Sequence, residues 1–109
     1  MQEKRFKLVF DEVMKDQLKK LAKDKNIRSI ISNFFDNMEY LGPDAGKLLD
    51  SKLFIYEMKN KHPPIRLYFK HVKETNEIYI FEYEMKSSEK KQEKTVQKIK
   101  FKTLGKFKR

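Results

Sequence analysis

The sequence predicts an α+β domain: an N-terminal strand and a two-helix hairpin packed on a mainly antiparallel four-stranded sheet, followed by a basic, helical C-terminal segment. Apolar residues recur at helical spacing through residues 12–41, and they alternate with polar residues in three runs between residues 53 and 85. Residues 86–109 hold ten Lys or Arg against two Glu. With 109 residues the chain can close one hydrophobic core, so residues 1–109 are expected to form a single domain.

The helical hairpin is expected to follow a short strand. In residues 6–10, FKLVF, the side chains alternate between two faces, as in a half-buried strand. Asp11 is a suitable N-cap for a first helix, and Asn26 for a second that ends at the Gly42–Pro43 pair. The second helix carries the strongest periodic stripe of the chain: Ile27, Ile30, Ile31, Phe34, Phe35, Met38 and Leu41.

Three further strands are predicted, over residues 53–59, 65–72 and 77–85, after a loop at residues 44–51. The first two are joined across NKHPP, where two prolines cannot donate to a sheet ladder, and the last two across KETN. We expect an antiparallel meander. The C-terminal helix is predicted to begin near Ser88, although Gly105 weakens it and KIKFK alternates like a strand.

Alternation assigns the strand residues to two faces. Ile65, Leu67 and Phe69 would lie under the helical hairpin, and so would the alternate residues of the last strand, Tyr79, Phe81, Tyr83 and Met85. The opposite face then gathers charged and hydroxyl side chains: Lys59, Arg66, Tyr68, Lys70 and Lys86 with Glu57, Glu82 and Glu84. Such a face suits a phosphate backbone, or it is an ordinary solvated face neutralised by cross-strand ion pairs.

The net charge of +10 comes mainly from residues 86–109. A basic segment of this density attracts polyanions, with nucleic acid the usual partner and an anionic membrane or an acidic protein the alternatives. Of the 26 basic residues 22 are lysines, so a lysine-rich proteome is a further explanation of the same composition.

Composition also excludes several kinds of site. The chain has no cysteine, which rules out disulfides, thiolate chemistry and cysteine-ligated zinc, and its three glycines leave no room for a glycine-rich nucleotide loop. Neither a signal-peptide core nor a membrane span is found, so a cytoplasmic location is expected. We expect no cofactor and no metal.

Two stretches resemble the RelE/ParE toxin superfamily, in particular its RelE and HigB-like branches. LLDSKLFIYEMKNKHPPIRLYFK at residues 48–70 is similar to the family's Leu-rich lead, its strand ending in a basic residue, and its strand carrying an arginine. IYIFEYEMKSSEKKQEKT at residues 78–95 is similar to the last strand and the basic segment after it. The resemblance covers nearly the whole chain. It implies a toxin of a type II toxin-antitoxin system that cleaves messenger RNA on the ribosome and is held inactive by a cognate antitoxin.

The resemblance also implies roles for particular residues. Arg66 would steady the scissile phosphate, with Lys59, His62 and Lys86 as further catalytic candidates. Messenger RNA and ribosomal RNA would be held by Lys61, Tyr68, Lys70, Lys90, Lys91 and Lys94. The chain departs from the family at Glu57, where RelE has a lysine, and it has no tyrosine after Tyr83, so the family's acid and stacking roles have no matching residue here.

The chemistry of RNA cleavage by an internal 2′-hydroxyl restricts the choice of residues. It needs a base, a cation for the developing phosphorane charge and an acid for the leaving 5′-oxygen, but no metal. The planar guanidinium of Arg66 suits the second role. Neighbouring glutamates favour a protonated Lys59, which argues against a lysine base and leaves a carboxylate or His62.

Two other functions stay open at the sequence level. A ParE-like toxin that inhibits DNA gyrase would share the fold without cleaving RNA, because fold does not choose between the two activities. A non-catalytic RNA-binding module would use the charge alone, and its affinity would fall steeply with salt.

Overall fold

A computed structural model of the chain describes residues 3–85 and 88–106. Its elements, in chain order, are β1 (Lys7–Phe10), α1 (Glu12–Lys20), a 3₁₀ turn (Leu21–Lys23), α2 (Lys25–Leu41), a second 3₁₀ turn (Gly42–Ala45), β2 (Lys47–Asp50), β3 (Ile55–Asn60), β4 (Ile65–Val72), β5 (Glu77–Met85) and α3 (Glu89–Lys106). The predicted α+β class is confirmed, and the C-terminal segment is a helix as expected.

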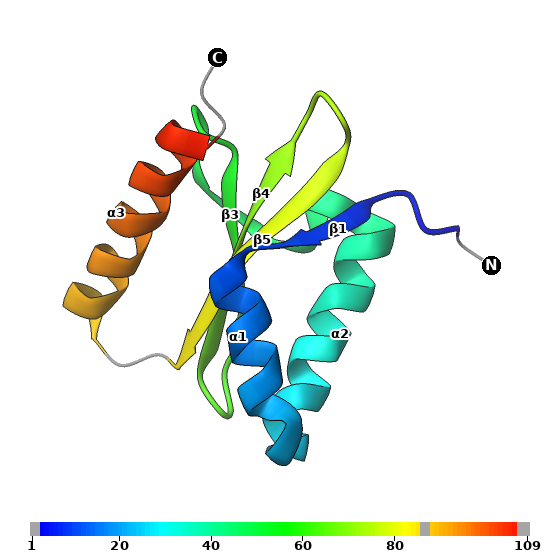
Figure 1. Ribbon diagram of the computed structural model, residues 1–109, viewed down its shortest axis with the longest axis vertical. Coiled ribbons are helices and arrows are strands. Elements are labelled where there is room, and N and C mark those ends of the chain that lie inside the picture. The colour runs from blue at the N-terminus through cyan, green and yellow to red at the C-terminus, as the bar shows by residue number, and fades with distance from the viewer. Residues whose placement is uncertain (1–2, 86–87, 107–109) are drawn as a thin grey trace.

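The strands form one sheet in the order β1-β5-β4-β3-β2 (Figure 1). β1 pairs with β5 in parallel, and the other three pairings are antiparallel. The four-stranded sheet that the sequence predicted gains a fifth strand, because residues 47–50, expected as loop, add β2 along the outer edge of β3.

One face of the sheet is covered by α1 and α2 (Figure 1). Met14 of α1 and Ile31 and Met38 of α2 pack there on Leu67 and Phe69 of β4. The helices begin where a side chain caps their free N–H groups. Asp11 accepts from Val13 N–H as predicted, but Asp24, not the expected Asn26, caps α2 by accepting from Ile27 N–H.

The other face of the sheet is covered by α3. Ile99, fully buried, packs there with Ile55, Tyr68, Tyr79 and Phe81. The sheet is therefore sandwiched between helices on both faces. The expectation of an uncovered charged face is wrong because the basic segment folds back over it.

The prediction that Tyr79 and Phe81 lie under the helical hairpin is also wrong. Both side chains belong to the cluster under α3, whereas Ile78 and Ile80 face α1 and α2. A register shift between Tyr68 and Phe69 in the β4–β5 ladder marks an extra residue in β5. Across this residue, the alternate side chains of β5 exchange the faces of the sheet to which they point. Simple alternation cannot follow a strand through such a bulge.

Candidate nucleic-acid interface

Two rows of polar side chains cross the middle of the sheet on the face under α3. In the ladders, Arg66 of β4 lies opposite Lys59 of β3 on one side and Glu84 of β5 on the other. The next row on the same face is Glu57, Tyr68 and Glu82. Directly opposite residues lie within reach of one another, so cation, guanidinium and carboxylate are held together by the sheet itself. We call the first row the Lys59–Arg66–Glu84 row.

Arg66 is bound diagonally to Glu57. One terminal guanidinium nitrogen of Arg66 donates to both carboxylate oxygens of Glu57, at 3.0 and 2.9 Å. Arg66 is 8% exposed and Glu57 2%. Each charge thus compensates the other where water is largely excluded. Arg66 Nε, also buried, has no hydrogen-bond partner among the described residues and remains a free donor on this face.

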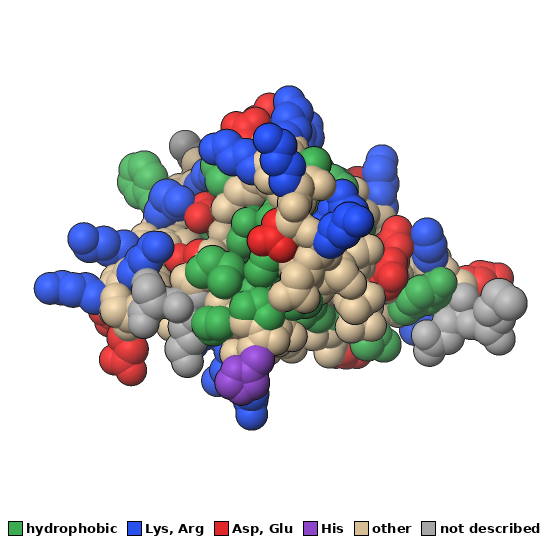
Figure 2. Space-filling model, turned by 90° about the horizontal axis from the view of Figure 1, so that it is seen from below, with side chains coloured by type: hydrophobic (Ala, Val, Ile, Leu, Met, Phe, Trp, Pro, Cys, Tyr) green, Lys and Arg blue, Asp and Glu red, His purple; other side chains and the backbone are tan. Residues whose placement is uncertain are grey.

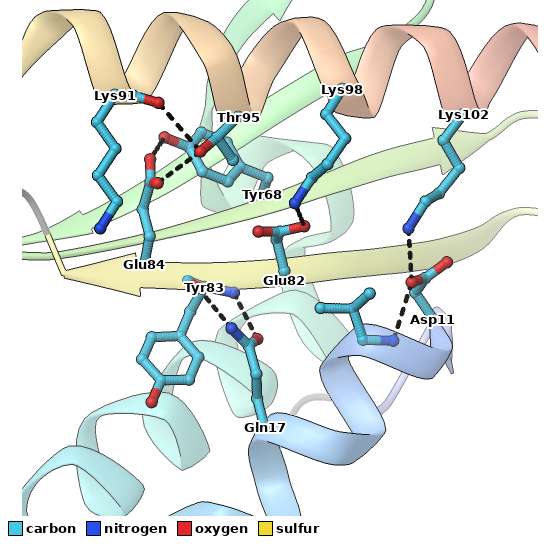
Figure 3. Close-up of polar contacts among 11 residues, drawn as sticks. Asp11, Gln17, Tyr68, Glu82, Tyr83, Glu84, Lys91, Thr95, Lys98 and Lys102 are labelled. Atoms are coloured by element: carbon cyan, nitrogen blue, oxygen red, sulfur yellow. Dashed lines mark hydrogen bonds and ion pairs between the residues drawn. The ribbon is translucent and has the colours of Figure 1, made fainter.

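Tyr68 and Glu84 form a second polar link, which includes α3 (Figure 3). Tyr68 donates its hydroxyl to one oxygen of Glu84 at 2.6 Å, and Thr95 of α3 donates to the other at 2.7 Å. Burial, followed by the hydrogen bond to Glu84, raises the pKa of Tyr68. Tyr68 therefore stays protonated at neutral pH and keeps Glu84 as its acceptor.

α3 is fastened to the sheet along its length by polar contacts. The side-chain amide of Gln92 donates to Glu57 at 3.2 Å, Lys98 pairs with Glu82 at 2.8 Å, and Lys102 reaches Asp11 at 2.9 Å. The two lysine contacts, drawn in Figure 3, neutralise a carboxylate of the sheet and the carboxylate at the start of α1. Part of the positive charge that suggested a polyanion partner is therefore paired with carboxylates of the same chain.

Asp11 is the point where three elements meet. It caps α1, accepts from the hydroxyl of Tyr79 at 2.6 Å, and pairs with Lys102 of α3. Burial acts to raise the pKa of Asp11, but the hydrogen bonds from Tyr79, Lys102 and Val13 N–H together outweigh it and lower the pKa. The carboxylate is therefore ionised in the folded protein and holds the C-terminal half of α3 in place.

The exposed cations among the predicted site residues lie in and beside the β3–β4 connection and on the first half of α3. Lys61 and His62, in the β3–β4 connection, are exposed, and Lys59 next to them keeps half of its side chain in solvent. Exposed lysines also occupy the first half of α3: Lys90, Lys91 and Lys94. In Figure 1 the β3–β4 connection is near the lower end, and α3 begins at the left about half-way up. Figure 2, which views the molecule from below, shows Lys and Arg side chains around its rim.

Comparison with known proteins gives a consistent result at the level of the fold. Neither a protein-family model nor a curated protein matches the sequence. Among solved structures, the isolated Escherichia coli RelE toxin has a TM-score of 0.62 and 19% identity, covering 87% of this chain and 99% of that one. The chain has the RelE fold.

Toxin-antitoxin complexes with the RelE fold are also similar. The intact E. coli RelBE complex matches with a TM-score of 0.60 and 19% identity, covering 77% of this chain and 100% of that one. The RelBE2 toxin-antitoxin complex of Mycobacterium tuberculosis matches with 0.60 and 18%, covering 74% and 98%. At these identities the likeness is one of fold.

On the RelE fold of this chain, the predicted site residues fall into four groups, of which the exposed lysines of α3 (Lys90, Lys91 and Lys94) are one. Arg66 and Lys59 come together in one row, as the alternation predicted, with Lys61 and His62 at its exposed end. Tyr68 and Lys70 share the face and are buried, Tyr68 in the cluster under α3 and Lys70 with its amine donating to the Leu53 carbonyl. Lys86 lies outside the described residues.

Sequence reasoning missed the residues of α3 that close the face. Thr95, Ile99 and Thr103, spaced four apart, form the buried side of α3. The spacing was visible, but two threonines are a weak apolar signal. Glu84 was placed on the face without a role, and its position opposite Arg66 in the ladder is the information that the register adds.

The described part of the chain contains no cluster of three or more His, Asp or Glu that could hold a metal ion. No helix in that part is both long and apolar enough to span a bilayer.

Proposed function

We propose that this protein is the toxin of a toxin-antitoxin system and cleaves messenger RNA on the ribosome. The observation that carries the proposal is the Lys59–Arg66–Glu84 row on a RelE fold: a cation, a guanidinium and a carboxylate in register on adjacent strands. Internal attack on a phosphodiester calls for these same groups.

In the proposed reaction, the ribose 2′-oxygen attacks the adjacent phosphorus and the bond from phosphorus to the 5′-oxygen breaks. Glu84 takes the 2′-hydroxyl proton, and Arg66 stabilises the charge that develops on the phosphoryl oxygens. Arg66 has the donor for this role, because its buried Nε has no hydrogen-bond partner among the described residues. His62, exposed at the end of the row, supplies the proton for the leaving oxygen.

The substrate reaches this row only when α3 moves. The helix lies over Tyr68 and takes one oxygen of Glu84 through Thr95, so the described arrangement is a closed one. Lys90, Lys91 and Lys94 are free to meet RNA phosphates on its exposed side. We infer that engagement of these lysines by ribosomal RNA competes with the contacts that hold α3 on the sheet.

A cognate antitoxin is the second proposed partner. Two of the similar structures are toxin-antitoxin complexes in which the matched chain has this fold. A protein that blocks the Lys59–Arg66–Glu84 row, or keeps α3 over it, would hold the toxin inactive.

The test is translation of a defined message in a purified system. The variant Glu57→Gln/Arg66→Gln removes the guanidinium without leaving a buried unpaired charge, and Glu84→Gln removes the proposed base. Lys19→Ala, which removes an exposed lysine of α1, is the control for a single charge change away from the row. We expect cleavage within codons on translating ribosomes by the wild type and Lys19→Ala, and loss of at least a hundred-fold in rate for the other two, as typical of a removed acid-base or charge-stabilising group.

Other outcomes would replace the proposal. Intact message with inhibited DNA supercoiling would indicate a gyrase-directed toxin. Intact message and normal supercoiling, with salt-sensitive RNA binding, would indicate an RNA-binding module without catalysis. Cleavage that survives in both site variants would show that a different set of residues performs the reaction.

A further inference from the structure

A cavity lies at the end of the molecule opposite the β3–β4 connection. It has a volume of about 510 Å³. Its walls come from the β2–β3 connection, the ends of β4 and its connection to β5, and the end of α3, which lie together at the upper end of Figure 1. This volume is in the range of small-molecule sites. Its lining includes Lys52, Phe54, Lys70, Lys73, Glu74 and Thr103.

Phe54 in this lining has a backbone conformation that side chains rarely adopt. Its φ is +57°, in the left-handed region that is costly for a bulky residue. The surrounding turn enforces it: Asp50 accepts from the N–H groups of both Lys52 and Leu53 at 2.9 Å, and the Phe54 carbonyl accepts from His71 N–H at 3.1 Å. Strain kept in this way is typical of functional positions, and here it presents an aromatic ring at the cavity.

Two lysine amines lie over that ring. Lys73 Nζ lies 4.9 Å from the ring centroid of Phe54, and Lys70 Nζ lies 5.5 Å from it. Lys70 is 8% exposed and donates to the Leu53 carbonyl at 2.6 Å. Burial lowers the pKa of Lys70, and the nearby carboxylates of Glu74 and Asp50 act against this. An anion in the cavity would stabilise the buried charge further.

The cavity lining thus combines three lysines and one carboxylate with an aromatic ring and a mainly apolar wall. This combination matches a ligand with a flat apolar part and a negative part. A phosphate bound among Lys52, Lys70 and Lys73 would make charge-assisted hydrogen bonds, and a base stacked on Phe54 would bury both aromatic surfaces.

We propose that this cavity is a nucleotide-binding site, with the phosphate held by the lysines and the base stacked on Phe54. It is separate from the Lys59–Arg66–Glu84 row and does not depend on cleavage activity. The same chemistry is offered by a free mononucleotide and by one nucleotide of an RNA strand.

Binding of adenosine 5′-monophosphate, measured by isothermal titration calorimetry, tests the site, with inorganic phosphate and adenosine as the separate parts. A fluorescently labelled RNA octamer, followed by anisotropy, tests the second source. Phe54→Gly removes the ring and fits the positive φ, so this variant is expected to fold, and Lys73→Ala removes a solvent-facing cation. Lys19→Ala removes the same charge from the exposed side of α1, outside the cavity lining, and is the matched control.

We expect the monophosphate to bind more tightly than phosphate or adenosine. Phe54→Gly and Lys73→Ala should each weaken its binding roughly ten-fold, and Lys19→Ala should have no effect. If these variant effects are seen with the RNA octamer but not with the monophosphate, the site is supported and its ligand is a nucleotide of an RNA strand. Equal binding of phosphate and monophosphate, an equal effect of Lys19→Ala, or no binding of either probe would overturn the proposal.

Discussion

Replacing Arg66 by alanine should destabilise the protein strongly, because the carboxylate of Glu57 loses its main partner. Glu57 is 2% exposed, and both of its oxygens accept from Arg66, at 3.0 and 2.9 Å. Among the described residues, the carboxylate would keep in the variant Gln92, at 3.2 Å, and Lys59, whose half-exposed ammonium is 4.0 Å away. Removing one partner of a buried pair costs about 3–5 kcal/mol, and these two remaining contacts place the loss near 3 kcal/mol.

Urea unfolding followed by circular dichroism measures this loss. A domain of this size has an m-value of about 1.5 kcal/mol per molar urea, so the midpoint should fall by roughly 2 M. The double variant Glu57→Leu/Arg66→Met removes both charges and keeps apolar volume. We expect its free energy of unfolding to lie within about 1 kcal/mol of the wild type, or above it, because well-packed apolar replacements of buried pairs are often neutral or stabilising.

Two results would refute this reasoning. If the free energy of unfolding of Arg66→Ala lies within about 1 kcal/mol of the wild-type value, Glu57 is not held in a low-dielectric position. If the double variant loses as much as the single one, the ion pair itself stabilises the fold. The comparison also separates folding from chemistry, since a cleavage defect in Arg66→Ala alone would not distinguish them.

Three further predictions concern α3, acid stability and the glycines. Ile99→Ala should lower the free energy of unfolding by about 2–4 kcal/mol, because it leaves a cavity under α3. Amide hydrogen exchange should become faster in α3 and β4 but not in α2. Equal acceleration in all three elements would show that α3 does not open separately. Folding lowers the pKa values of Asp11 and Asp50 below the ordinary 3.8. The free energy that these carboxylates add to the folded state is therefore present above pH 3.8 and is lost as the pH falls through their lower folded pKa values. In Asp11→Asn, the free energy of unfolding measured in urea should fall less between about pH 5 and pH 2 than in the wild type. Gly42→Ala should lower the melting temperature, because φ is +59° and the new carbon would meet the Phe6 ring at 2.4 Å, whereas Gly105→Ala, in open space on α3, should raise it.

Much of the candidate site could be read from the sequence. The two-residue period puts Lys59 and Arg66 on one face once the apolar side of each strand is turned to the helices, and the ladder confirms them as direct neighbours. Glu84 fell on the same face by the same argument. The pairing of Arg66 with Glu57 is diagonal, and no local pattern distinguishes it from a pairing with Glu82 or Glu84.

Other features could not be predicted because their signals are weak or distant. β2 is a four-residue edge strand that begins with the exposed pair Lys47 and Leu48, which reads as a loop. The bulge in β5 depends on the pairing of that strand with β4, so alternation alone assigned Tyr79 and Phe81 to the wrong face.

The sequence by itself determined the helical hairpin, the meander and the shared face of Lys59 and Arg66, because these follow from periods of 3.6 and 2 over a few neighbouring residues. Only the tertiary structure decided that this face is closed. Thr95, Ile99 and Lys98 meet Glu84, Tyr68 and Glu82 across the molecule, and such contacts arise only once the sheet has brought those partners together. In the sequence the basic segment is typical of a surface for a polyanion. In the folded chain it covers the sheet and binds carboxylates of the same chain.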